Sequence, residues 1–137
     1  MRDFELGILT PAGAFFSGNV QALFVRTTSG EVGIMAEHTD YLAGVVPCVA
    51  SLTERDGKDR AAFCGGGFLS VVAGKVTLAV DEFAFAEEID AGAATDQAHQ
   101  LADQLAACNA KEQPERAQYL KDAMIRAEAK RKAASAR

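Results

Sequence analysis

Residues 29–47 read SGEVGIMAEHTDYLAGVVP. Gly30 suits a turn position with positive φ, and Gly33 suits a bulge or a close approach of another part of the chain. The β-branched residues on either side of Gly33 predict a short strand. A polar corner that holds His38 follows, and residues 41–46 then predict a buried strand that ends before a proline.

The rest of residues 1–86 repeats this alternation of short apolar runs and turns. Strands are predicted at residues 4–10, 20–27, 32–35, 41–46, 48–53, 60–64, 68–72, 75–80 and 83–86. Nine or ten short strands separated by turn residues are typical of an all-β sandwich or barrel. We therefore expect a β-sandwich of about ten strands, and the large side chains Phe16, Phe24, Phe68 and Leu78 lie within it.

The period of the apolar residues changes near Glu87. Apolar positions now recur at steps of three and four, first from Ala94 to Cys108 and again from Ala117 to Arg131, with Pro114 placed at a helix start. Residues 87–137 are thus predicted to form an antiparallel two-helix hairpin, which makes the fold class β + α. The contact between the two helices, which we call the seam, consists mostly of alanines. A buried CH₂ contributes only about 0.8 kcal/mol, so separating the helices should cost little free energy. Residues 132–137 are expected to fray.

Charge is divided unevenly along the 137 residues. The first 114 residues carry a net charge of −9, and the last 23 carry +4. A basic tail on an acidic body suggests an acidic partner, although a solvated helix face would explain it equally well. The acidic body and the lack of aromatic residues between the tail's cations argue against nucleic acid. The sequence shows no apolar run of eighteen residues and no leader-like segment at Met1, so a cytosolic location is expected.

The three cysteines, Cys48, Cys64 and Cys108, form no C-x-x-C motif. Cys48 and Cys64 lie in apolar strand patterns, which predicts buried, reduced thiols. A disulfide or a metal site are the alternatives.

Four motifs in order carry a family resemblance. They are Phe16-Ser17-Gly18 before a strand, Gly30-Glu31-Val32-Gly33-Ile34 with His38 after it, Gly65-Gly66-Gly67-Phe68 before Val71-Val72, and Glu88-Ile89-Asp90 before an alanine-rich helix. Each motif is weak alone, but together they cover nearly the whole chain. The sequence resembles the epsilon subunit of F-type ATP synthases.

The resemblance implies a non-catalytic subunit of the rotor's central stalk. Such a subunit would bind the gamma subunit with one face of the sandwich and the ring of c subunits with one end, coupling ion transport to ATP synthesis. It implies a rotor-binding domain at residues 1–86, with Glu31, Gly33, Glu37 and His38 together at the ring-facing end. The location implied is the cytoplasmic side of a bacterial membrane, reached only through the complex.

The hairpin, residues 87–137, would then be a candidate regulatory domain. When extended, its basic residues Arg126, Lys130 and Arg131 would reach the alpha and beta catalytic subunits and inhibit ATP hydrolysis. Some members of the family bind ATP on this hairpin through an Ile/Leu-Asp-x-x-Arg-Ala motif. Here Ala93 stands in place of the arginine, and a methyl group cannot pair with a phosphate. Asp90 and Arg126 remain weak ATP candidates, so we predict no cofactor and no metal.

Two other functions stay open on the residues alone. His38, with Glu31, Glu37 and Asp40 near it in sequence, could serve a small cytosolic hydrolase as a metal ligand or general base. A β-sandwich adaptor with a helical docking tail is the other alternative. The glycine run at residues 65–67 lacks the Lys-Ser/Thr of a phosphate loop and favours a tight bend with close backbone approach.

The acid pairs Asp81-Glu82 and Glu87-Glu88 could take part in acid–base chemistry. Their positions at element boundaries favour the simpler interpretation that they stabilise the start of a following helix.

Overall fold

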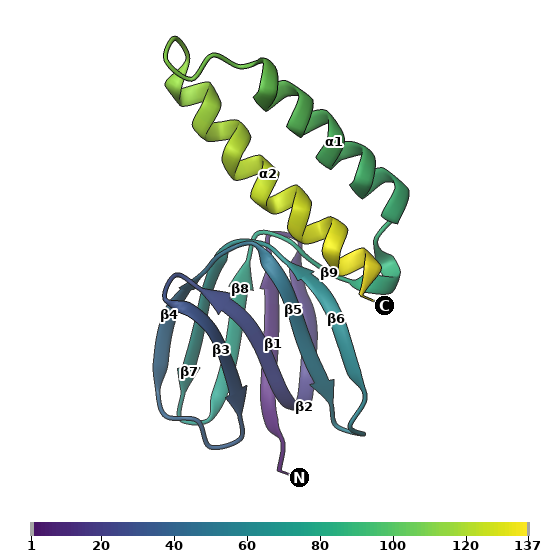
Figure 1. Ribbon diagram of the computed structural model, residues 1–137. Helices are drawn as coiled ribbons and strands as arrows, with labels where there is room; N and C mark the ends of the chain where they lie inside the picture. The colour runs from purple at the N-terminus through teal and green to yellow at the C-terminus, as the bar shows by residue number, and fades with distance from the viewer. Residues whose placement is uncertain (1, 137) are drawn as a thin grey trace.

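The computed structural model describes residues 2–136 and confirms a β-sandwich followed by two helices (Figure 1). Within these residues there are nine strands: β1 (Phe4–Thr10), β2 (Gly13–Thr27), β3 (Gly30–Met35), β4 (Tyr41–Val45), β5 (Cys48–Glu54), β6 (Asp59–Cys64), β7 (Gly67–Val72), β8 (Lys75–Val80) and β9 (Phe83–Phe85). The main difference from the prediction is β2, which begins at Gly13 rather than Val20.

The strands form one continuous hydrogen-bonded order that folds over into two layers. The order is β1-β8-β7-β4-β2-β5-β6-β9, with β3 beside β2 and with β1 also paired to β2. All neighbours are antiparallel except β1 and β8, which are parallel. Alternate residues of both layers point inward, as a half-buried strand requires, and make one apolar core that includes Leu6, Ile8, Leu23, Leu69 and Leu78.

Three of the predicted glycine roles are confirmed. Gly30 has a φ of +120°, which side-chain-bearing residues rarely adopt, at the turn between β2 and β3. A Cβ on Gly33 would lie only 2.6 Å from a ring carbon of Phe24, so the absence of a side chain lets that ring lie across β3. A Cβ on Gly67 would lie 2.0 Å from the carbonyl oxygen of Ala79, which is the close backbone approach expected for the glycine run.

The hairpin begins directly after the last strand. A short 3₁₀ helix, Ala86–Glu88, leads into α1 (Ala91–Ala107), whose first turn is capped by Asp90 accepting the N–H of Ala93 at 3.0 Å. Helix α2 (Pro114–Ser135) starts with the predicted proline and returns alongside α1. The seam is as poor in large residues as expected; its buried members are Ala94, Ala98, Ala117, Leu120 and Ala127. Within residues 2–136 neither helix is long and apolar enough to cross a membrane.

The prediction that residues 132–137 fray is wrong for the part that the structure describes. Helix α2 remains regular to Ser135, and Ala133 and Ala134 are buried. They pack with Phe63 and Ile89 in a small second apolar cluster between α2 and β6. The sequence did not predict this packing for two reasons. Alanines give only a weak signal for burial, and Phe63, the large residue that they cover, lies on a different element.

Residues 1–88 should fold without the hairpin, because the main core lies wholly between Phe4 and Phe85. Cutting the chain after Glu88 removes the cover from Phe63, so we expect a lower midpoint but still one cooperative thermal transition. Circular dichroism and calorimetry of the fragment would measure it. A broad, non-cooperative melt would show that the sandwich depends on the helices and is not an independent domain.

Candidate functional site

The hairpin is held on one end of the sandwich by an ion-pair cluster that we call the latch: Asp81 and Glu82 after β8, and Arg126 and Lys130 on α2. The guanidinium of Arg126 donates from Nη1 to both carboxylate oxygens of Asp81 at 3.0 and 3.1 Å and from Nη2 to Glu82 at 2.7 Å. Lys130 Nζ donates to the other oxygen of Glu82 at 2.7 Å. Two elements 44 or more residues apart are thereby joined by charge-assisted hydrogen bonds.

The ring of Phe63 supports the two cations of the latch. Phe63 is fully buried, and the charged groups of Arg126 and Lys130 lie 5.3 and 5.1 Å from its ring centroid. The face of an aromatic ring attracts cations, so ring and latch stabilise each other. Partial burial alone would raise the pKa of Glu82, but hydrogen bonds from Lys130 and Arg126 hold that pKa below its ordinary value. The carboxylate of Glu82 is therefore charged at neutral pH.

A second tether fixes the start of the hairpin. Arg60 on β6 pairs with Glu54 and with Glu87, and its guanidinium lies 3.5 Å from the centroid of Phe85. Glu88 accepts the backbone N–H of Phe85. The two acid pairs singled out in the sequence therefore attach the hairpin, and Asp81 and Glu82 precede a strand rather than a helix.

The two ATP candidates are both engaged within the chain. Asp90 caps α1, and Arg126 belongs to the latch. A hollow beside them is lined by the carboxylates of Glu82, Glu88 and Asp90, and Lys130, already bound to Glu82, is the one cation among the described lining residues. A triphosphate would meet mostly negative charge in this conformation.

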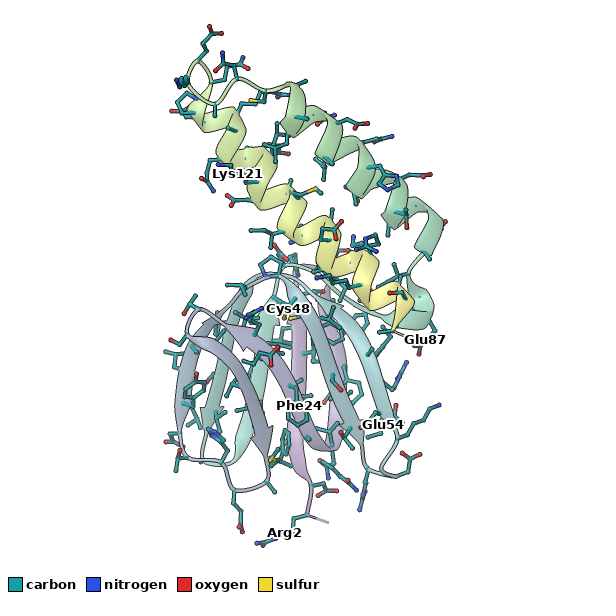
Figure 2. The ribbon with its side chains drawn as sticks, in the orientation of Figure 1. Arg2, Phe24, Cys48, Glu54, Glu87 and Lys121 are labelled. Atoms are coloured by element: carbon teal, nitrogen blue, oxygen red, sulfur yellow. The ribbon has the colours of Figure 1, made fainter. Side chains whose placement is uncertain are left out.

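The structure corrects the expectation that Glu31 and His38 lie at the same end of the sandwich. Glu31 is near the start of β3, at the end that carries the hairpin, and shares a groove with Lys132 of α2. Glu37 and His38 come after the end of β3, where Glu37 pairs with Arg2. Figure 2 shows Arg2 at the end of the sandwich far from the helices. A six-residue strand spans about 17 Å. The strand predicted at residues 32–35 therefore separates Glu31 from His38, and the family resemblance alone had placed the two at one end.

The local contacts of these residues differ as well. Within the described residues Glu31 forms no ion pair, and it is exposed. His38 lies with its Nδ1 2.7 Å from the carbonyl oxygen of Thr39 and its ring edge-on to Tyr41. The acidic residues that were to assist His38 in catalysis are thus divided: Glu31 is at the other end, and Asp40 accepts the N–H of Ala73.

The helices lie against one end of the sandwich, so its broad faces carry no helix, and one of these faces is notably apolar (Figure 1). This open face is the outward side of β1, β4, β7 and β8, where the pairing register aligns small and apolar residues in rows. Its members are Gly7, Leu9, Leu42, Gly44, Phe68, Ser70, Val72, Thr77 and Ala79. Leu42, Phe68 and Val72 are among the most exposed large apolar side chains described, and the charged pair Glu5–Lys75 lies at the margin. Such a patch marks an interaction surface.

The sequence analysis missed both the latch and the open face. It singled out Asp81-Glu82 and the basic tail separately, but nothing in the spacing links them. For the open face, the alternation of Phe68, Ser70 and Val72 with buried residues was visible, and an apolar residue at an outward position was the signal that could have revealed it.

Comparison with known proteins agrees with this architecture. Residues 3–86 match the family described as ATP synthase, Delta/Epsilon chain, beta-sandwich domain. The chain therefore belongs to this family. Two curated relatives are each named ATP synthase epsilon chain. The one from Clostridium acetobutylicum is 36% identical over 89 residues, which cover 65% of this chain and 67% of that protein. The one from Caldicellulosiruptor bescii is 42% identical over 92 residues, which cover 66% of this chain and 65% of that protein. The match thus spans about two thirds of the relatives' length.

A solved structure shares the fold. A chain in the cryo-EM structure of the Euglena gracilis mitochondrial ATP synthase, described as OSCP/F1/c-ring, superimposes with a TM-score of 0.79 over 93% of this chain and 78% of that chain. The sequence identity is 20%, so this likeness concerns the fold alone.

The latch depends on the missing side chain of Gly65. A Cβ there would lie 2.0 Å from Oδ1 of Asp81 and 3.2 Å from Nη1 of Arg126. Gly65→Ala should therefore displace the Asp81 carboxylate, leave the sandwich folded and loosen α2, which trypsin would then cut several-fold faster at its lysines and arginines. Gly66→Ala is the matched control, because its Cβ would meet no atom nearer than 3.5 Å. Equal digestion rates for the two variants would show that Asp81 does not hold the hairpin.

Proposed function

We propose that this chain acts in the central stalk of an ATP synthase, where it joins the gamma subunit to the ring of c subunits on the cytoplasmic side of a bacterial membrane. In that position it would transmit the rotation driven by ion flow and would carry out no chemistry of its own. The open face supports this proposal most strongly, because it is a large uncovered apolar surface on a chain that belongs to the epsilon family.

The open face suits a permanent partner. Its rows of small residues leave the sheet nearly flat, and Leu42, Phe68 and Val72 stand out from it as anchors. Interface centres are depleted in charge and rich in large apolar groups, as this face is. We assign it to the gamma subunit.

The ring contact must lie elsewhere on the sandwich. A flat ring cannot touch both ends of β3 at once, so Glu31 and His38 do not serve it together. We assign the contact to the β2–β3 turn with Glu31, since this exposed carboxylate is free of ion pairs among the described residues whereas Glu37 already pairs with Arg2. Gly33 lies two residues further along β3, where the absence of a side chain makes room for the ring of Phe24.

Binding to gamma can be tested with a single exposed residue. Leu42→Glu places a charge on the most exposed apolar side chain of the open face, so we expect at least a tenfold loss in co-purification with gamma and an unchanged melting temperature. Tyr119→Glu is the control, because Tyr119 is 68% exposed against 73% for Leu42 but lies on α2. Gamma retained equally by both variants would remove the open face from the interface.

We propose in addition that the hairpin regulates ATP hydrolysis by leaving the sandwich. The latch is built from partly exposed charges, and such pairs contribute only about 0.2–1 kcal/mol each. Undocking also uncovers Phe63, but the residues of α2 that cover it are alanines, each of which buries little apolar surface, so undocking is within reach of a competing acidic surface. Once released, Arg126, Lys130 and Arg131 could bind acidic groups on the alpha and beta subunits and obstruct rotation in the direction of hydrolysis.

The acidic half of the latch offers the sharper test, because replacing the cations would remove the latch and the inhibitor together. Asp81→Asn with Glu82→Gln weakens docking by about 1–2 kcal/mol, roughly 5- to 30-fold in the ratio of docked to free hairpin. We expect slower ATP hydrolysis by the assembled complex with this variant, and faster hydrolysis when residues 88–137 are deleted. Hydrolysis that is the same in the wild type, the double variant and the deletion, at low and high salt, would rule out an inhibitory hairpin.

A further inference from the structure

Two of the three cysteines lie opposite each other on the neighbouring strands β5 and β6. Cys48 is the first residue of β5 and Cys64 is the last residue of β6, and the strand register places them directly opposite. Both side chains belong to the apolar core. Their separation by fifteen residues, with no C-x-x-C pattern, hid this pairing in the sequence.

The backbone positions are compatible with a disulfide. At the hairpin between β5 and β6, the N–H of Glu54 donates to the carbonyl oxygen of Lys58. In an antiparallel pair of strands every second residue pair is hydrogen-bonded, so Cys48 and Cys64, six residues further along each strand, also form a hydrogen-bonded pair. The Cα atoms of such a pair lie about 5.5 Å apart. Disulfides have Cα separations near this value but need closer Cβ atoms than such a pair offers. The required shift falls at two strand ends, where Pro47 precedes one cysteine and Gly65 follows the other.

The two thiols have unequal surroundings. The neighbouring Cys64 thiol, as a donor to the Cys48 thiolate, and the backbone N–H of Arg26, whose nitrogen lies 3.4 Å from Cys48 Sγ, lower the pKa of Cys48 to about 7 despite its burial. The same contact with Cys48, together with burial, raises the pKa of Cys64. In the structure the Cys64 thiol donates to the carbonyl oxygen of Gly65 at 3.4 Å, and it can turn to Cys48 when that residue ionises.

Solvent reaches Cys48 but not Cys64. Cys48 is 7% exposed and lines a groove of about 570 Å³ between α2 and the outer side of β2, β3 and β5, whereas Cys64 is 0% exposed. Figure 2 shows Cys48 at the end of the sandwich nearest to α2. The charged groups around the groove are Arg26 on β2, Glu31 on β3, and Glu128 and Lys132 on α2. The attacking and resolving roles are thereby distinguished.

We propose that Cys48 and Cys64 are a reversible redox pair that low-molecular-weight disulfides oxidise to a cross-strand disulfide. The Cys48 thiolate attacks one sulfur of the oxidant, forming a mixed disulfide and releasing one thiolate. The Cys64 sulfur then attacks Cys48 Sγ and gives up its proton to the departing sulfur, so the second half of the oxidant leaves as a thiol. Two electrons pass to the oxidant, and one disulfide is exchanged for another.

The bond would form directly beside the latch. Gly65 follows Cys64 directly and lies against the Asp81 carboxylate, which forms an ion pair with Arg126. Cys48 lines the groove beside α2. A disulfide that must draw two hydrogen-bonded strands together is strained, and strained disulfides are readily reduced. The pair is therefore suited to respond to changing conditions rather than to stabilise the fold.

The test uses the full-length Cys108→Ser protein, which retains the pair and removes the third thiol, in buffers of glutathione and glutathione disulfide. Thiol counting and mass spectrometry should show that both thiols disappear with no glutathione retained. Adding Cys64→Ala should trap one glutathione on Cys48, and adding Cys48→Ala should leave the Cys64 thiol unmodified. Oxidation should accelerate about tenfold per pH unit up to about pH 7 and then level off, as the thiolate fraction does.

Two results would overturn the proposal. One is a Cys108→Ser protein that keeps both thiols at every glutathione ratio while its fold is native by circular dichroism. The other is a disulfide that forms only between molecules. The rate measurement needs no further substitution in the pair, so a variant that fails to fold does not leave the question open.

Discussion

The structure depends on β2 belonging to both layers of the sandwich. Its first part, from Gly13 to Val20, pairs with β1, and its second part pairs with β3 and β5. The register shifts by one residue between Val20 and Ala22, so Gln21 is a bulge. Side chains of a strand point alternately to its two faces, so one extra residue reverses which residues point inward. Before the bulge the inward residues of β2 have even numbers, as Val20 has, and after it they have odd numbers, as Leu23 and Val25 have, so all three are buried in the core.

Closure by β2 also determines which surfaces remain available for partners. The turn between β2 and β3, the segment around Pro47 and the bends at Gly65 and Asp81 gather at one end, and α2 rests there. The far end holds the chain start and the His38 corner, and the outward side of β1, β4, β7 and β8 stays free. A partner on the open face would therefore not compete with the docked hairpin, whereas a partner at Glu31 would lie directly beside α2, because Glu31 and Lys132 line the same groove.

Local patterns in the sequence predicted most of the elements. Apolar alternation gave the strands, the step of three and four gave both helices, and Gly30 and Pro114 marked a turn and a helix start correctly. The first half of β2 was missed because Phe15-Phe16-Ser17-Gly18 does not alternate cleanly. The latch and the Cys48–Cys64 pair depend on register and on packing between distant elements, which residue spacing within one element does not encode. The separation of Glu31 from His38 follows from a single strand, which the sequence predicted at residues 32–35.

The division of charge along the sequence now has a physical explanation inside the molecule. The basic tail suggested an acidic partner, and in the structure part of that partner is the chain's own sandwich: Asp81 and Glu82 bind Arg126 and Lys130. Arg131 is occupied by Glu128 of its own helix. Any external acidic surface must therefore compete with these carboxylates, and the difference between the two sets of contacts decides where the hairpin lies. The latch consists of partly exposed ion pairs that salt screens, so no single contact decides the position of the hairpin. The number and geometry of the charges that a competing surface offers would set the balance.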